Sequence, residues 1–255
     1  MKVTVFNGSP RGRNSNTHRI VEPLLEGARE AGAETEEVFL VERDIEHCRG
    51  CFGCWGKTPG KCVINDEMPE LMDLFLESDY VGLGTPIYSM YMTGLLKIFT
   101  ERLLPLATPH IRKNADGTFY HDGRTKRFPR VFCVANCGFP GEHNFDLLKA
   151  MIVQMSPVLE VYRNCGEVLS DPSAADIPAI SEFYDALRQA GKEMVTGGRV
   201  SEETARRIHA ELIESPRILV TSVVSKRRHI LRKSYQNSLQ LPVPVHIYVI
   251  LSMSG

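Results

Sequence analysis

The sequence has little that would direct it to a nucleic acid or a membrane. Its 30 Lys and Arg residues are balanced by 31 Asp and Glu residues, so the 255-residue chain carries a formal net charge of −1. A balanced chain has no overall positive field for DNA, RNA or anionic lipid. Its apolar runs are far shorter than the ~20 residues that span a bilayer, and its first residues lack the features of a secretory leader. We therefore expect a cytoplasmic protein that binds neither nucleic acid nor membrane.

Strand and helix patterns alternate along most of the chain. Short β-rich runs occupy 2–6, 34–40, 79–85, 130–135 and 158–163, and helical patterns occupy 16–31, 67–77, 93–104, 143–155 and 174–196. This alternation predicts βαβ units, a parallel sheet and right-handed crossovers. We expect a doubly wound α/β domain over 1–205, with helices on both faces of the sheet, and a C-terminal extension over 206–255.

Two stretches depart from this alternation. Residues 105–129 contain Asp-Gly pairs at 116–117 and 122–123, which predict a small hairpin. Loops this long are usually lids or partner surfaces. The tail after Ser215 carries a basic run at 226–233, which we interpret as a solvated surface, and an apolar end at 245–251. Because that end should not lie bare in water, we expect the extension to act as an oligomerisation arm.

The loop after the first predicted strand has the composition of a phosphate site. Glycines at 8 and 12 let backbone N–H groups converge, and the helix that follows favours an anion at its start. The loop lacks the glycine patterns of dinucleotide folds and nucleoside triphosphatases. Hydroxyls without lysine suit a phosphate monoester, although the same residues also make an ordinary helix cap. The candidate phosphate-binding residues are Ser9, Arg11, Ser15, Asn16 and Thr17.

Three segments together resemble the NADPH-dependent FMN reductase family. They are V-F-N-G-S-P-R with the following N-T, G-T-P-I-Y-S-M-Y-M-T-G-L-L-K at 84–97 and C-G-F-P at 137–140, and the resemblance covers roughly 1–205. It implies a flavodoxin-like fold, FMN as cofactor, and a homodimer or homotetramer. It also implies hydride transfer from NAD(P)H to the flavin and electron transfer to a small acceptor, such as a quinone or free flavin. Because the flavin does the chemistry, we expect no catalytic side chain.

The resemblance also assigns the ring-binding loops. The first loop wraps the FMN phosphate, the second lies along the isoalloxazine ring, and the third approaches the ring from the next strand end. A fixed turn at a proline and an aromatic side chain suit a flat ring. The implied ring-binding residues are Pro86, Ile87, Tyr88, Ser89, Asn136, Cys137 and Gly138.

Four of the seven cysteines lie within fifteen residues, in the pattern C-x2-C-x2-C-x7-C. An odd total and a reducing compartment argue against a disulfide framework. Three thiolates at i, i+3 and i+6 are typical of [4Fe–4S] proteins, whereas zinc sites more often use two separated C-x2-C pairs. We interpret Cys48, Cys51, Cys54 and Cys62 as ligands of a [4Fe–4S] cluster, with zinc second and free thiols as the remaining alternative.

The cysteine segment at 47–63 resembles the motif of the iron-sulfur flavoproteins. That resemblance implies an alternative function, in which flavin and cluster relay electrons between protein partners such as ferredoxin. His110 and His121 flank the 105–129 excursion, and we interpret both as solvated surface residues. We take 105–129 as the segment that covers the nicotinamide of a neighbouring subunit.

Overall fold

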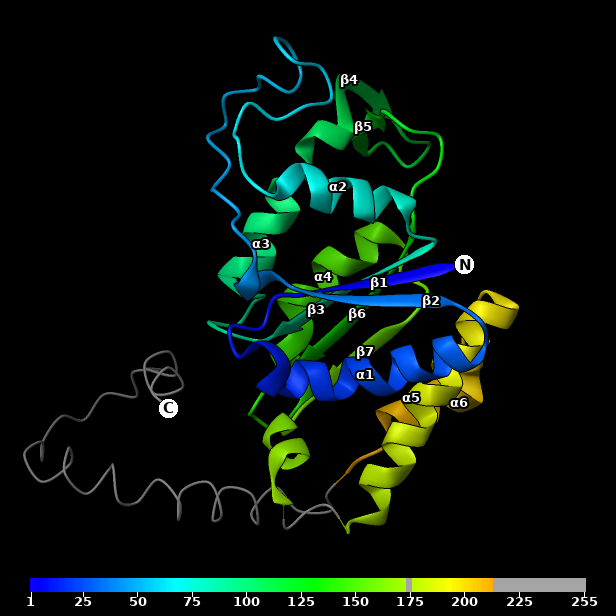
Figure 1. Ribbon diagram of the computed structural model, residues 1–255. Coiled ribbons are helices and arrows are strands. Elements are labelled where there is room, and N and C mark those ends of the chain that lie inside the picture. The colour runs from blue at the N-terminus through cyan, green and yellow to red at the C-terminus, as the bar shows by residue number, and fades with distance from the viewer. Residues whose placement is uncertain (173–175, 213–255) are drawn as a thin grey trace, which may run out of the picture.

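The computed structural model describes residues 1–172 and 176–212. Its centre is a five-stranded sheet in the order β2-β1-β3-β6-β7, and every neighbouring pair is parallel (Figure 1). This order places the first strand beside the second and third, which is the flavodoxin-like arrangement. The strands are β1 (Lys2–Asn7), β2 (Glu34–Phe39), β3 (Tyr80–Pro86), β6 (Arg130–Asn136) and β7 (Glu160–Arg163). The predicted fold class is confirmed.

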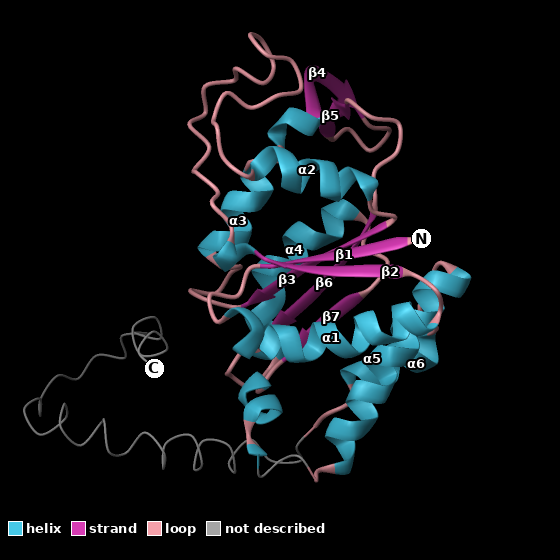
Figure 2. Ribbon diagram, in the orientation of Figure 1, coloured by secondary structure: helices cyan, strands magenta, loops and turns pink. Residues whose placement is uncertain are grey.

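Helices cover both faces of the sheet (Figure 2). One face carries α1 (Asn16–Glu30), α5 (Pro178–Gly197) and α6 (Glu202–His209), and the other carries α2 (Met68–Glu77), α3 (Gly94–Glu101) and α4 (Asp146–Ile152). The core is accordingly split into two apolar clusters, one on each side. Every residue of β3 is buried, as expected for a central strand covered on both faces.

Two predicted helices are shorter than expected. The pattern at 143–155 yields α4 over seven residues, flanked by the 3-10 turns Glu142–Phe145 and Val153–Met155. The pattern at 93–104 yields α3, which ends at Glu101 before a 3-10 turn at Leu104–Leu106. Pro105 lacks a backbone N–H and stands in that turn, so the helix cannot continue through it.

The excursion at 105–129 contains the predicted hairpin. Its strands β4 (Ala107–Lys113) and β5 (Phe119–Gly123) are antiparallel and form a sheet of their own. Figure 1 shows this hairpin beyond α2, well away from the central sheet. It packs beside the cysteine segment, because the rings of His121 and Trp55 lie 4.8 Å apart between centroids.

Near the C-terminus, α6 packs against α5 and β7 and crosses the expected domain boundary at 205–206. The basic run and the apolar end of the tail lie outside the described residues, so the arm and the domain division stay predictions. Within 1–172 and 176–212, no helix has the length and apolar character needed to cross a membrane.

Candidate functional site

The first loop, between β1 and α1, is folded by its own polar side chains. The Ser9 backbone N–H donates to Asn7 Oδ1 at 2.9 Å, and Ser15 Oγ caps α1 by accepting from the His18 backbone N–H at 3.0 Å. Gly12 has φ +52°, a conformation that glycine adopts without strain. The loop therefore stands preformed at the N-terminus of α1, where orphan N–H groups and the helix dipole favour an anion.

Four of the five predicted phosphate-binding side chains are buried here. The side chains of Ser9, Ser15 and Thr17 are almost fully buried, and Asn16 is only 4% exposed. The buried Oδ1 of Asn16 has no hydrogen-bond partner. Leaving such a group unpaired costs ~1–3 kcal/mol. An amide oxygen only accepts, so this atom suits a hydroxyl of a ligand and not a phosphate oxygen, which also accepts. Arg11 is exposed, with its Nη1 at 3.9 Å from Glu167 Oε1.

The second loop begins where β3 ends and turns back sharply. The backbones of Tyr88 and Tyr91 exchange N–H···O bonds of 2.9 and 3.0 Å, with Ser89 and Met90 at φ +50° and +68° between them. Such a turn usually contains Asn or Gly, so the sequence carried no signal for it. Two non-glycine residues at positive φ are a local strain of the kind that clusters at ligand sites. The two backbone hydrogen bonds keep half-buried Tyr88 at this edge.

The third loop joins the first two. Asn136 Nδ2 donates to Thr17 Oγ1 at 2.8 Å, and the Asn136 carbonyl accepts from the Ile87 N–H at 2.7 Å. Burial raises the pKa of the Cys137 thiol to about 12, so this thiol is neutral at physiological pH. Gly138 is exposed beside it. One residue from each of the three loops is therefore tied to the next at the carboxyl end of the sheet.

Two features of this edge were missed by the sequence reasoning. Glu167, in the turn after β7, reaches toward Arg11 across the loops, and both charges act on the Tyr88 phenol, whose pKa burial raises. Buried Glu37 on β2 accepts from Asn7 Nδ2 at 2.8 Å and contacts His18 Nδ1 at 2.6 Å. Neither glutamate has a motif around it, because each is brought to the site only by the sheet order.

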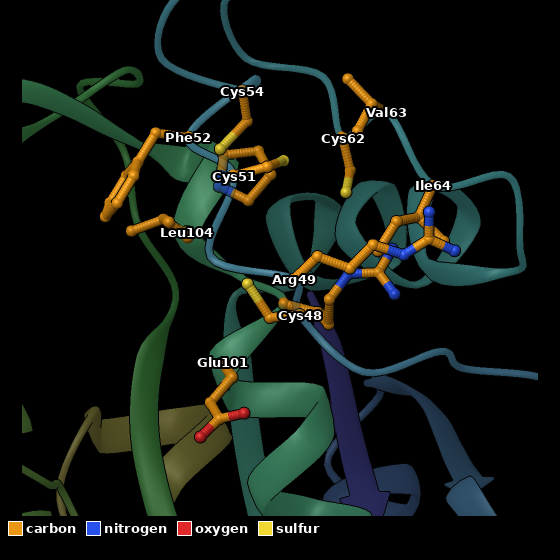
Figure 3. A pocket seen from close by; sticks show the side chains of 12 residues that line it. Cys48, Arg49, Cys51, Phe52, Cys54, Cys62, Val63, Ile64, Glu101 and Leu104 are labelled. Carbon is orange, nitrogen blue, oxygen red and sulfur yellow. The ribbon is translucent and has the colours of Figure 1, made fainter.

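The cysteine segment forms a second site. Cys48, Cys51, Cys54 and Cys62 all line one small pocket that opens to solvent. The charged side chains of Arg49, Glu101 and Arg102 and several apolar side chains line it as well. Figure 3 shows the four sulfurs grouped around the same opening. No disulfide joins them, and Cys54 is only 8% exposed. The four predicted metal ligands are thus brought together.

The electrostatics of this pocket suit a cation. Burial raises the pKa of Cys54, and the charges of Cys62, Cys48 and Cys51 raise it further. A thiol whose ionisation is opposed in this way needs positive charge nearby before it becomes a thiolate. No three of these sulfurs lie within 4.8 Å of one another in the described part of the chain, as the ligands of one metal ion would. Four thiols around one opening are the donor set of a cluster with thiolate ligands, which would supply the positive charge.

The cysteine segment contains no helix or strand between 47 and 63, and a few side chains attach it to the rest of the chain. Trp55 Nε1 donates to the Leu104 carbonyl at 3.4 Å. Arg124 bonds two carbonyls, Cys54 O at 3.3 Å and Pro105 O at 3.0 Å. The buried pair of Arg102 and Asp66 fastens both ends of the segment.

The two sites lie at opposite ends of α3. At its N-terminus, Thr93 caps the helix and its hydroxyl donates to the Gly8 carbonyl of the first loop at 2.6 Å. At its C-terminus, Arg102 lines the cysteine pocket. Eight helical residues rise ~12 Å, so this one helix separates the cysteine pocket from the three loops.

The strand order and the three loops define a flavodoxin-like fold, and comparison with known proteins agrees. A family model described as NADPH-dependent FMN reductase matches residues 1–115. An iron-sulfur flavoprotein of Methanocaldococcus jannaschii is 32% identical over 153 residues, which cover 60% of this chain and 75% of that protein. Another, from Archaeoglobus fulgidus, is 37% identical over 105 residues, which cover 41% of this chain and 46% of that protein.

The chain belongs to the family of the iron-sulfur flavoproteins, and its residues 1–115 match the model of the NADPH-dependent FMN reductases. It is accordingly an FMN-dependent oxidoreductase, as predicted. The chain spans about half the length of the Archaeoglobus relative and three quarters of the Methanocaldococcus one.

Solved structures share the fold at low sequence identity. An FMN-dependent NADH-azoreductase from Bacillus anthracis, in complex with FMN, aligns with a TM-score of 0.55 and 16% identity over 76% of this chain and 99% of its own. An NAD(P)H:quinone oxidoreductase from Methanothermobacter marburgensis gives 0.54 and 17% over 76% and 96%. At this identity the likeness shows the fold alone.

Proposed function

We propose that this chain binds FMN across the three loops and passes electrons from NAD(P)H to a small acceptor, such as a quinone or free flavin. The observation that carries the proposal is the junction of the three loops at the carboxyl end of the sheet, where Asn136 bonds both Thr17 and Ile87. Bound FMN supplies hydride acceptance and electron release, and the chain supplies binding and orientation.

The three loops divide the binding of this cofactor. The residues at the phosphate are Ser9, Arg11, Ser15, Asn16 and Thr17; those beside the ring are Pro86, Ile87, Tyr88, Ser89, Asn136, Cys137 and Gly138. The neutral thiol of Cys137 and the raised pKa of Tyr88 leave neither group a ready base at neutral pH. This supports a reaction in which neither of these two side chains moves a proton.

A second function, electron relay between protein partners such as ferredoxin, is supported by the cysteine pocket. In that reading Cys48, Cys51, Cys54 and Cys62 hold a [4Fe–4S] cluster, which supplies one-electron transfer when bound. If the same pocket holds zinc or free thiols, only the NAD(P)H-driven reductase function remains. The two functions differ in which donor reduces the flavin fast.

Rapid-mixing reduction of the FMN-loaded, full-length protein tests both functions. The reductase predicts fast bleaching of flavin absorbance by NADH or NADPH, followed by reoxidation with a quinone. The relay predicts fast reduction by ferredoxin and slow reduction by either nicotinamide. Failure to bind added FMN at all would contradict both.

The assembly and location are further parts of the proposal. Seven cysteines without a disulfide support a reducing compartment, the cytoplasm.

We infer a homodimer or homotetramer in which the hairpin of 105–129 covers a neighbour's nicotinamide site. Exposed apolar side chains on that hairpin, Ile111, Phe119 and Tyr120, support a covered surface. Light scattering of the full-length protein gives the order of the assembly, and a monomer would contradict this part.

A further inference from the structure

Arg102 is an unusual residue for its position, because a long cation at a helix end normally reaches water. Its side chain is only 1% exposed, and that of Asp66 is fully buried. Nη1 of Arg102 donates to Asp66 Oδ2 at 2.6 Å and Nη2 donates to Asp66 Oδ1 at 3.0 Å. Two parallel bonds between a guanidinium and a carboxylate are the strongest form of such a pair.

The pair joins the two ends of the cysteine segment. Nη1 of Arg102 also donates to the Glu46 carbonyl at 2.6 Å, just before the first ligand cysteine. Asp66 follows the last ligand cysteine and accepts the Glu46 N–H at 2.9 Å. The backbone at residue 46 and the side chain of residue 66 are therefore joined through one guanidinium, and the four cysteines lie between them.

One donor of Arg102 is left over. Its Nε–H is buried and has no hydrogen-bond partner, although the guanidinium lines the pocket of the four cysteines. Among the four cysteines, Cys62 is the one whose side chain interacts with this guanidinium. Since a buried unpaired donor is costly, this N–H points to an acceptor that arrives with the bound group.

We propose that Arg102 is a positioning residue of the four-cysteine site, which closes the loop through Asp66 and offers its spare Nε–H to a ligand sulfur, at Cys62. The proposal rests on the metal or cluster site of the proposed function. Hydrogen bonds and positive charge next to ligand sulfurs stabilise thiolates and make reduction of a cluster easier. Arg102 would thus strengthen binding and raise the cluster's reduction potential.

Cadmium titration of the metal-free, full-length protein tests the proposal without any need for a cluster. The probe is Cd²⁺ under reducing conditions, followed by its sulfur-to-metal absorbance. Arg102→Met is expected to weaken Cd²⁺ binding ~10–100-fold, the range for residues behind metal ligands. The matched control is Arg124→Met, because Arg124 also bonds the segment's backbone but does not line the pocket. Its effect should stay within about threefold.

Three results would overturn the proposal: equal Cd²⁺ affinity in Arg102→Met and the wild type, equal losses in both methionine variants, or no thiolate binding of Cd²⁺ by the wild type. FMN affinity serves as the folding check, since its site lies at the other end of α3. If Arg102→Met fails this check, the neutral pair Arg102→Met with Asp66→Asn replaces it, because removing both charges avoids an unpaired buried ion.

A second readout separates positioning by charge from simple loop closure. In protein reconstituted with iron and sulfide, Arg102→Lys retains the charge and should keep the cluster's midpoint potential near that of the wild type. The neutral double variant should shift it to a more negative value. Equal potentials in wild type and double variant would contradict the assigned role. If the protein binds Cd²⁺ but no cluster can be reconstituted, the relay function is overturned. The cadmium comparison of Arg102→Met with Arg124→Met then decides the role of Arg102 by itself.

Discussion

The loops at the sheet edge and the cysteine segment are held in different ways. At the sheet edge, three short loops start from buried strands and are tied to one another by bonds such as Asn136 to Thr17. The cysteine segment has no regular backbone, and Cys48 and Cys51 are exposed. Its position depends on a few side chains, chiefly Arg102, Trp55 and Arg124.

This contrast separates a preformed site from one that its ligand completes. The hydrogen bonds of the sheet fix the three loops before any cofactor arrives, so FMN would bind with little reordering. In the cysteine pocket, burial and the charges of the other three cysteines oppose ionisation of the Cys54 thiol, so binding of a cation would help to order the segment. Each prediction below changes one region and asks whether the other responds.

The largest effect is expected for Cys54→Ser. Cys54 is the most buried of the four proposed ligands, and its loss would leave three sulfurs for a group that needs four. Iron content after anaerobic reconstitution should fall at least about tenfold, while FMN affinity stays unchanged. Iron retained at the wild-type level would show that the cysteines are not the ligands, and a parallel loss of FMN would show that the two regions fold as one.

Asn16→Ala should have the next largest effect, on the other region. The variant removes the buried amide whose Oδ1 lacks a partner in the free protein. We expect FMN affinity to fall about tenfold, equivalent to ~1.4 kcal/mol, as measured by quenching of flavin fluorescence. Cd²⁺ binding at the cysteines serves as the control and should not change. Wild-type affinity for FMN would remove Asn16 from the site.

Arg11→Ala should have a smaller effect that depends on the phosphate. Arg11 is exposed and faces Glu167, so a bond to phosphate would be screened by water. FMN affinity should fall about threefold, and riboflavin affinity should remain the same because riboflavin has no phosphate. A comparable loss for both flavins would place Arg11 away from the phosphate.

The smallest expected effects concern pH, and they have opposite signs in the two regions. Burial raises the pKa of Glu37 beside the first loop, so its contribution to stability is present below pH 4.5 and is lost as pH rises through the folded-state pKa. Burial also acts to raise the pKa of Asp66, but bonds from Arg102 and two backbone N–H groups lower it overall. Its contribution is present above pH 3.8 and is lost as pH falls through the folded-state pKa.

Urea denaturation at several pH values measures both effects. Relative to wild type, Glu37→Gln should gain in unfolding free energy as pH rises above 4.5, because it lacks a group that loses stability there. Asp66→Asn should be most destabilised above pH 3.8 and approach wild type below it. Changes of the same sign in the two variants would contradict the assignment.

The regular part of the fold could be predicted from sequence because its signals are local. Short β-rich runs located the five strands of the central sheet, and Asp-Gly pairs located the hairpin. The second loop could not be predicted, since Ser89 and Met90 adopt positive φ without being Asn or Gly. Such a conformation is imposed by the packing around it.

The candidate site shows the same division. The cysteine spacing pointed to four ligands that the structure brings together in one pocket. The residues behind them were missed, because Asp66 and Arg102 are 36 residues apart and meet only when α3 packs beside the segment. Glu37 likewise reaches the first loop from β2 and Glu167 from the turn after β7, and no spacing in the sequence marks them.

Anaerobic purification followed by a visible spectrum, with FMN, iron, sulfide and zinc assayed on the same sample, tests the central claim most directly. The account predicts flavin bands together with about four iron and four sulfide per chain, and the loss of iron alone in Cys54→Ser. A protein with flavin and no iron after reconstitution would contradict the cluster site. A protein that binds neither flavin nor iron would contradict the account as a whole.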